Sequence, residues 1–530
     1  MDSTQLVQIR KDYYNLTRKR VEHLVGAETK ELKLYRERYE KELNRLDWVS
    51  IDQKHLFVRL EKAQLVVVGD FHAQKQSSRG LLRIIRKMKK PLILGLECLR
   101  AQDQKNIDLF LKGQLSERDF LNQISWKKNW GFPWENYRPL FKWAQQHKVR
   151  VFGLNSSSRQ KTLRERDEFS ADVVSRIKQA YPEHQLFIQY GDLHLASMHL
   201  PKSIQKKNPK INLCVVYQSP EILYFKIMES HQELTTDVVK LSEDRWAING
   251  LPPWVKWQDY LLLLESGYDR KVSLTDLDPT DTVWRSVELI SKSFNMITKF
   301  DALSVYSSSD DVFFEKIETL GAVLRRRILE NVQEGNSFYV PELQIGYLAR
   351  LSVNHVTKLA AQYIYFQEKG FQKTIVDPKK DFLKLIWLEA VTYFCSKVKN
   401  PKRKTDTLQD IRNSLQKEQF DDRGKEALSL ALTQKLTEHQ FLSENNIKSM
   451  SAESFSKINR KSFAVAAQIL GGILGEKLFY AFNKKLLRLP LNKNLIFKNL
   501  QAPHFNKSYY ESLEMLESWP LAFASKFDKL

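Results

Sequence analysis

Two copies of one short polar pattern are the strongest candidates for chemistry in this chain. Gly69-Asp70-Phe71-His72 and Gly191-Asp192-Leu193-His194 both read G-D-x-H, and each follows an apolar run. A glycine lets the chain turn sharply off a strand, so the histidine that follows can point into the space above a sheet. Paired imidazoles can bind a first-row metal, and they can also act as acid and base on a bound substrate.

A carboxylate occupies the equivalent place after another apolar run. Glu97 together with His72 and His194 would form a metal site with positions left open for water or substrate. The same set could instead transfer protons. Asp70 and Asp192 would then orient the two histidines, as carboxylates behind metal-binding imidazoles commonly do. The sequence therefore predicts a functional cleft built from these residues.

The apolar runs themselves predict the scaffold. Short, continuously apolar segments alternate with helical periodicity along the first half of the chain, which indicates a mostly parallel sheet flanked by helices. We expect strands at 65–69, 92–97, 149–155, 185–191, 212–217 and 222–228. Ligands bind at the carboxyl ends of parallel strands, which is where the polar residues fall, Asn155 included.

Length predicts more than one domain, because 530 residues exceed the size of an ordinary single core. We expect an N-terminal helical segment at 1–50, the α/β domain at 51–235 and a connector at 236–280 that contains Pro252-Pro253-Trp254-Val255-Lys256-Trp257. A large all-α domain at 281–530 would follow. Its expected helices lie at 283–294, 311–330, 341–369, 381–399, 408–417, 424–440 and 461–485.

Composition excludes a mostly disordered chain, since 42% of the residues are apolar and 11% aromatic. The formal net charge is +21, but basic clusters such as 325–327 and 399–404 are short and far apart. We therefore expect solvated helix faces and no nucleic-acid binding. Three scattered cysteines, Cys98, Cys214 and Cys395, fit a reducing compartment and do not form a disulfide framework.

Neither a secretory signal nor a lipobox is visible in the first residues, where basic side chains follow Met1 with no apolar stretch between them. The most apolar late segment, 463–475, contains Gln468 and three glycines. It falls short of the roughly 20 apolar residues that a membrane span needs. We expect a cytoplasmic protein without a membrane span.

Several of these segments together resemble a known bacterial family. The most specific is W-G-F-P-W-E-N-Y-R-P-L at 130–140, and it is joined by the two G-D-x-H motifs and by the segments 65–72, 94–100, 104–113 and 153–155. Over about residues 50–230 the chain resembles the ChaN-like haem-binding uptake family of the Tiki superfamily. TraB-type proteins and erythromycin-esterase-like enzymes belong to the same superfamily.

The resemblance implies a ligand cleft at the strand ends, with haem or a divalent transition metal as cofactor and a role in iron uptake. Position by position, it implies His72, Glu97 and His194 as cofactor-binding, metal or active-site residues, with Arg166 supporting them. Tyr190 is a further candidate haem ligand by residue type. The family commonly has G-E-x-H in the first motif, whereas this chain has Asp70.

Three functions stay open at this point. The first is a protein that binds haem, a metal or another small ligand. The second is a metal-dependent hydrolase or peptidase of the Tiki or TraB type, in which a metal held by His72, Glu97 and His194 activates water. The third is a non-catalytic scaffold that acts through its helical half. The sequence leaves the natural ligand, the metal and the oligomeric state open.

Overall fold

The computed structural model describes residues 3–26, 28–156, 162–265, 279–296, 303–307, 310–368, 370, 373–416, 422–444, 458–489 and 491–519. The chain divides into two compact units, one formed by Tyr14–Val272 and the other by Met1–Tyr13 with Ser273–Leu530. The first helix, α1 (Ser3–Val25), contributes to both. Of the expected connector, residues 266–278 lie outside the described part.

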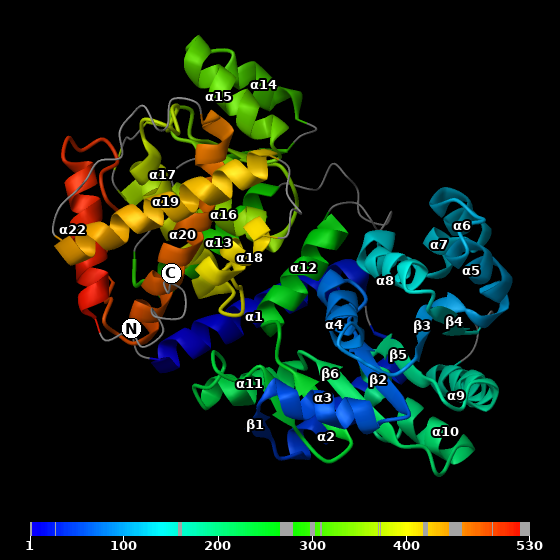
Figure 1. The fold of residues 1–530 in the computed structure, drawn as a ribbon. Coiled ribbons are helices and arrows are strands. Elements are labelled where there is room, and N and C mark those ends of the chain that lie inside the picture. The colour runs from blue at the N-terminus through cyan, green and yellow to red at the C-terminus, as the bar shows by residue number, and fades with distance from the viewer. Residues whose placement is uncertain are drawn as a thin grey trace. The chain divides into compact units, whose positions relative to one another are not determined.

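An eight-stranded sheet forms the centre of the Tyr14–Val272 unit, in the order β1-β7-β8-β6-β2-β5-β3-β4 (Figure 1). Neighbours from β8 to β4 run parallel, and β7 is antiparallel to both β8 and β1. The expected mostly parallel sheet is confirmed. Its strands are β1 (Val49–Ile51), β2 (Leu65–Asp70), β3 (Leu92–Arg100), β4 (Arg150–Asn155), β5 (Gln185–Gly191), β6 (Leu213–Gln218), β7 (Val238–Lys240) and β8 (Arg245–Ile248).

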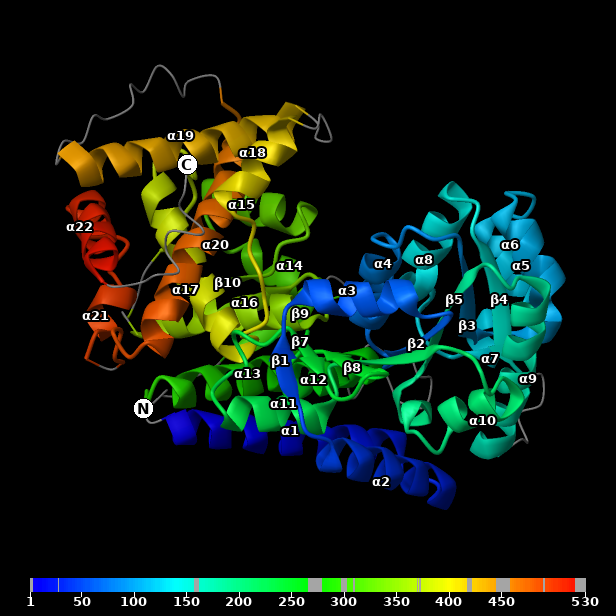
Figure 2. The same cartoon turned by 60° about the horizontal axis from the view of Figure 1, so that its bottom comes forward.

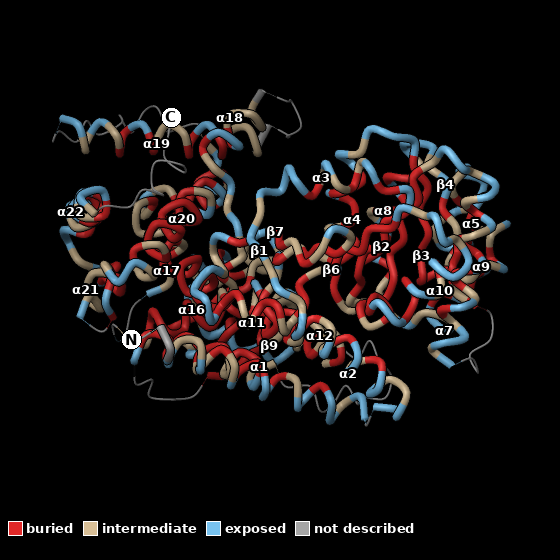
Figure 3. Tube along the Cα trace, turned by 90° about the horizontal axis from the view of Figure 1, so that it is seen from below, coloured by how far each residue is buried: buried red, intermediate tan, exposed pale blue. Residues whose placement is uncertain are grey.

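Helices cover both faces of this sheet. One face carries α3 (Gln53–Lys62), α4 (Lys75–Ile85), α5 (Gln104–Leu111), α6 (Glu117–Gln123), α7 (Trp126–Asn129) and α8 (Trp134–Gln146). The other carries α2 (Lys30–Arg45), α9 (Leu163–Ala180), α10 (Leu200–Lys207) and α11 (Glu221–Glu229). The helix α12 (Pro253–Glu265) ends the described part of the unit. Because the strands are covered twice, β2 and β3 are buried along almost their whole length (Figure 3).

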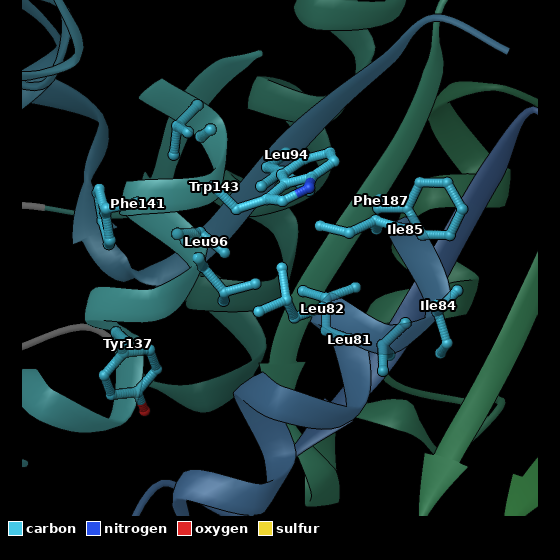
Figure 4. Packing of buried hydrophobic residues seen from close by; sticks show 14 of the residues in the cluster. Leu81, Leu82, Ile84, Ile85, Leu94, Leu96, Tyr137, Phe141, Trp143 and Phe187 are labelled. Carbon is cyan, nitrogen blue, oxygen red and sulfur yellow. The ribbon is translucent and has the colours of Figure 1, made fainter. Parts of the chain in front are cut away.

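The core on the α4 and α8 side is rich in aromatic rings. Figure 4 shows the aliphatic side chains of α4 packed with those of β3 and β5 and with rings from α8, namely Leu81, Leu82, Ile84, Ile85, Leu94, Leu96, Tyr137, Phe141, Trp143 and Phe187. The W-G-F-P-W-E-N-Y-R-P-L segment therefore supplies mainly core: Trp134 and Tyr137 are buried in this cluster and Trp130 is partly buried against it.

One expected strand is wrong. Residues 222–228 lie in the helix α11, which begins directly after Pro220. Its buried residues Leu223, Tyr224, Ile227 and Met228 repeat with a helical period. A short apolar run buried among neighbours is compatible with either element, and here the proline at the helix start and the four-residue repeat decide it.

The Ser273–Leu530 part is mostly helical, as expected, but it is not all-α, because it also contains a small three-stranded sheet. Its elements are α13 (Pro279–Ser293), β9 (Ser304–Ser307), α14 (Asp311–Ile317), α15 (Ala322–Gln333), β10 (Phe338–Val340), β11 (Ile345–Leu348), α16 (Val353–Glu368), α17 (Phe382–Lys399), α18 (Leu408–Gln416), α19 (Asp422–Glu444), α20 (Arg460–Asn483), α21 (Lys493–Ile496) and α22 (Phe505–Ser518). The expected helix 341–369 starts only at Val353, because Pro341 and a positive-φ Gln344 turn the chain from β10 into β11.

The helices α17 and α20 pack side by side in this unit (Figure 2). Glycines permit the close approach: a Cβ added at Gly475 would lie 2.5 Å from the carbonyl oxygen of Ala390. By length and composition α20 could cross a membrane, yet 83% of its most apolar window is buried inside the structure. Such burial is typical of a core helix.

Candidate functional site

The first G-D-x-H motif lies at the carboxyl end of β2 and holds its histidine through its own aspartate. Nδ1 of His72 lies 2.9 Å from Oδ2 of Asp70, and the hydroxyl of Tyr137 donates to the same oxygen over 2.9 Å. Burial lowers the pKa of His72, but the carboxylates of Asp70 and Glu97 outweigh it and the pKa is raised. The imidazole is therefore fixed through Nδ1, with Nε2 turned away from Asp70.

Glu97 stands at the centre of the polar cluster on β3. Its Oε1 accepts a hydrogen bond from Nη2 of Arg166 over 2.7 Å, and its Oε2 accepts one from the backbone N–H of Gly191 over 2.6 Å. The same Oε2 lies 3.8 Å from Nε2 of His72. Burial raises the pKa of Glu97, but the charges of His72, Arg166 and His194 and the Gly191 hydrogen bond lower it by more, so the net shift is downward.

The ring of His72 is partly open to solvent and flanked by aromatic side chains. Its side chain is 25% exposed, against 3% for Glu97. The ring centroids of Trp130 and Phe132 lie 4.5 and 5.3 Å from that of His72. A partly exposed imidazole ring thus lies beside aromatic rings and a buried carboxylate.

The second motif has a different arrangement. Nδ1 of His194 lies 2.6 Å from Oδ1 of Asp167, on α9, and the hydroxyl of Tyr35 donates to the other carboxylate oxygen over 3.1 Å. The His194 side chain is only 9% exposed. This histidine is therefore held by a partner outside its own motif, on the helix that precedes β5.

The aspartate of the second motif pairs with a buried lysine instead of with its own histidine. Nζ of Lys256 on α12 donates to Oδ2 of Asp192 over 3.1 Å and lies 3.7 Å from Glu221. Nζ also lies 4.3 Å from the ring centre of Phe71. Burial raises the pKa of Asp192, although the charge of Lys256 opposes this. Burial lowers the pKa of Lys256, but the carboxylates of Asp192 and Glu221 outweigh it and the pKa is raised.

Tyr190 is fully buried. Its hydroxyl lies 2.8 Å from Oγ of Ser170, and its ring packs edge-on against His194 with centroids 5.0 Å apart. Burial raises the pKa of this tyrosine well above its usual value, with the charge of Glu97 adding to the effect.

Of the predicted residues, the structure brings His72, Glu97 and Arg166 together in one cluster. Within the described ranges no hydrogen bond or ion pair joins His194 to these three, and no group of three or more His, Cys, Asp or Glu side chains is placed to hold a metal ion. The roles assigned to these residues from the sequence stay predictions.

The sequence alone does not indicate which side chains orient the two motifs. Tyr137 lies in the segment 130–140 that carries the resemblance, Asp167 directly follows Arg166, and Lys256 lies in the expected connector. The sequence does contain a feature that indicates the role of Lys256, because it is a lysine inside the apolar run P-P-W-V-K-W. In the structure it is buried on α12. A lysine is almost never fully buried without a partner.

Comparison with known proteins agrees with the resemblance. Residues 56–197 match the family model described as "Haem-binding uptake, Tiki superfamily, ChaN". No curated protein matches the chain. A solved structure described as cofacial heme binding to ChaN of Campylobacter jejuni is 15% identical, covers 32% of this chain and 87% of that one, and superposes with a TM-score of 0.25. Over residues 56–197, the segment that carries both G-D-x-H motifs, this chain therefore resembles the ChaN family of haem-binding uptake proteins.

Proposed function

We propose that the Tyr14–Val272 unit binds haem at the carboxyl ends of β2, β3 and β5, with Nε2 of His72 as the ligand of the iron. The observation that carries the proposal is the accessible His72 ring, whose Nδ1 is held 2.9 Å from Asp70. A carboxylate on one imidazole nitrogen fixes the ring and raises the basicity of the other, which is the usual arrangement behind a metal-binding histidine. The match of residues 56–197 to a haem-binding family supports the same ligand.

The neighbouring side chains suit haem in two further respects. Trp130 and Phe132 flank His72 at centroid distances of 4.5 and 5.3 Å and offer apolar surface to a porphyrin. Arg166 is 26% exposed and keeps donors in addition to the one that Glu97 uses. A guanidinium in this position is suited to a haem propionate. Haem would supply an iron, which the imidazole of His72 would hold.

The hydrolase hypothesis uses the same residues, but the geometry favours it less. Both carboxylate oxygens of Glu97 already accept hydrogen bonds, from Arg166 and from the N–H of Gly191. This arrangement fits an anchor for the site better than a primary metal ligand. We place the protein in haem or iron handling, with the cytoplasmic location expected from the sequence as part of this proposal.

A haem titration followed by absorption tests the proposal. The full chain should take up haem with a shifted Soret band, and His72→Ala should weaken binding by about 100-fold, the loss of roughly 2.7 kcal/mol. His55→Ala is the matched control, because His55 is an exposed histidine on α3. Haem uptake that is equal in wild type and His72→Ala, or absent from wild type, would contradict the proposal.

A further inference from the structure

A small cavity lies inside the Ser273–Leu530 part of the chain, outside every site predicted above. Its volume is about 70 Å³, and since a single water needs roughly 10–15 Å³ on this measure, it has room for a group of several atoms. Side chains from α15, β10, α16, α17 and α20 line it. The lining residues that matter here are Arg327, Phe338, Lys358, Gln362, Phe366, Glu389 and Ala464.

Arg327 is the third of three consecutive arginines and the one that is buried. Arg325 pairs with Glu318, Arg326 is exposed, and the Arg327 side chain is only 8% exposed. Its Nη1 lies 3.5 Å from Oε2 of Glu330, whose side chain is 37% exposed. Nε of Arg327 has no hydrogen-bond partner among the described residues.

A buried guanidinium cannot lose its charge. Burying a charge is costly unless it is paired and its donors are satisfied. A single contact at 3.5 Å with the half-solvated Glu330 satisfies Arg327 only in part. Arg327 therefore adds to the cavity lining a cation whose Nε–H donor lacks an acceptor among the described residues.

The other charged groups of the lining balance each other. Nζ of Lys358 lies 2.8 Å from Oε1 of Glu389, so this pair adds no net charge. Arg327 is the remaining charged residue of the lining, and its ion-pair partner Glu330 is not part of the lining. Gln362 uses its side-chain carbonyl to accept the backbone N–H of Tyr339 over 2.9 Å, which leaves its amide nitrogen as a donor.

The remaining lining combines polar and apolar side chains, and its apolar part includes Phe338 on β10 and Phe366 on α16. We propose that this cavity is a binding site for a small organic monocarboxylate, with the carboxylate on Arg327 and an apolar body against Phe338 and Phe366. A planar carboxylate matches the fork of a guanidinium and would supply the acceptor that Nε of Arg327 lacks. With Lys358 already paired to Glu389, the described lining has no further cation for a phosphate dianion.

A calorimetric titration of the full chain tests the site, with benzoate as the probe and inorganic phosphate and benzyl alcohol in parallel. Benzoate should bind, and Arg327→Met should weaken it at least tenfold. Arg326→Met is the matched control, because it removes the same charge from an exposed position on the same helix, and its affinity should stay within twofold of wild type. Benzyl alcohol, which lacks the carboxylate, should bind at least tenfold more weakly than benzoate.

A second variant keeps the test decisive if Arg327→Met does not fold. Ala464 is a small lining residue on α20, and Ala464→Leu fills the cavity without changing any charge. It should also weaken benzoate at least tenfold. The proposal would be overturned if the wild-type chain did not bind benzoate or bound phosphate instead. It would also be overturned if the variants bound benzoate as tightly as wild type. It is independent of haem, so His72→Ala should leave benzoate binding unchanged.

Discussion

The two G-D-x-H motifs are alike in sequence and differ in every partner. His72 binds the aspartate of its own motif at 2.9 Å and is 25% exposed. His194 binds Asp167 of α9 at 2.6 Å and is 9% exposed, while its own motif's Asp192 pairs with Lys256. The first motif thus presents a histidine to solvent, and the second joins neighbouring elements of the fold.

The backbone after each strand accounts for the difference. After β2 the chain turns directly, and His72 stays beside Asp70. After β5 it enters a short 3-10 helix, Asp192–Leu195, which separates the side chains of Asp192 and His194 onto different neighbours. The four-residue pattern therefore predicts that a histidine follows the strand end. Which side chain it bonds to depends on the elements that pack around it.

The largest effect should come from breaking the second motif's buried ion pair. Lys256→Met leaves Asp192 and Glu221 without their cation, so the free energy of unfolding should fall by about 3–5 kcal/mol. Urea unfolding measures it, with the exposed Lys202 of α10 changed to Met as control. A variant as stable as wild type would show that Lys256 does not hold the second motif.

Substituting the aspartate of each motif should show that the first motif binds haem and the second stabilises the fold. Asp70→Asn removes the carboxylate behind His72 and should lower haem affinity by about 10–100-fold, the range for a residue that orients a metal ligand. Asp192→Asn, the same change in the second motif, should lower stability and leave haem affinity within about threefold. Equal losses of haem affinity in both variants would mean that the motifs act alike.

Gly191 is the point where the two motifs touch. A Cβ added there would lie 3.2 Å from Nε2 of His72 and 3.3 Å from Oε2 of Glu97, so Gly191→Ala should cost about 1 kcal/mol of stability through crowding and also weaken haem. Gly250→Ala is the control, since its added Cβ would meet nothing nearer than 3.7 Å. If Gly191→Ala and Gly250→Ala changed the thermal unfolding temperature equally, the close packing of Gly191 against His72 and Glu97 would not matter for stability.

The smallest effect should be on pH dependence, through Glu97. Its pKa lies below the ordinary 4.5 in the folded protein, because His72, Arg166 and the Gly191 N–H outweigh burial. A carboxyl with a lowered folded pKa stabilises the fold above its unfolded pKa, and that stability is lost as the pH falls through the folded value. Between about pH 5 and 3 wild type should therefore lose more stability than Glu97→Gln, as urea unfolding at a series of pH values would record. Parallel pH profiles would contradict this.

The sequence predicts the scaffold well where burial is strong and poorly where elements are short. Continuous apolar runs identify β2 to β6 because such strands are covered on both faces. The same criterion misassigns 222–228, which is the helix α11. It also misses β7 and β8, since strands of three and four residues hold too few positions for a pattern.

The site was predictable only up to its strand ends. Strand topology brings His72, Glu97 and the Gly191 backbone together, as a parallel sheet requires. The partners that distinguish the two motifs come from α9 and α12, and nothing in a four-residue motif indicates which helix will face it. A charged residue inside an otherwise apolar helix, such as Lys256 in α12, is the sequence signal for such a partner.

The most direct measurement is the haem affinity of His72→Ala and His194→Ala determined side by side on the full chain, with folding checked by circular dichroism. The two variants make the same change in the same motif. We expect haem affinity to fall by about 100-fold in His72→Ala and by no more than about threefold in folded His194→Ala. A larger loss in His194→Ala than in His72→Ala would contradict the assignment of His72 as the haem ligand.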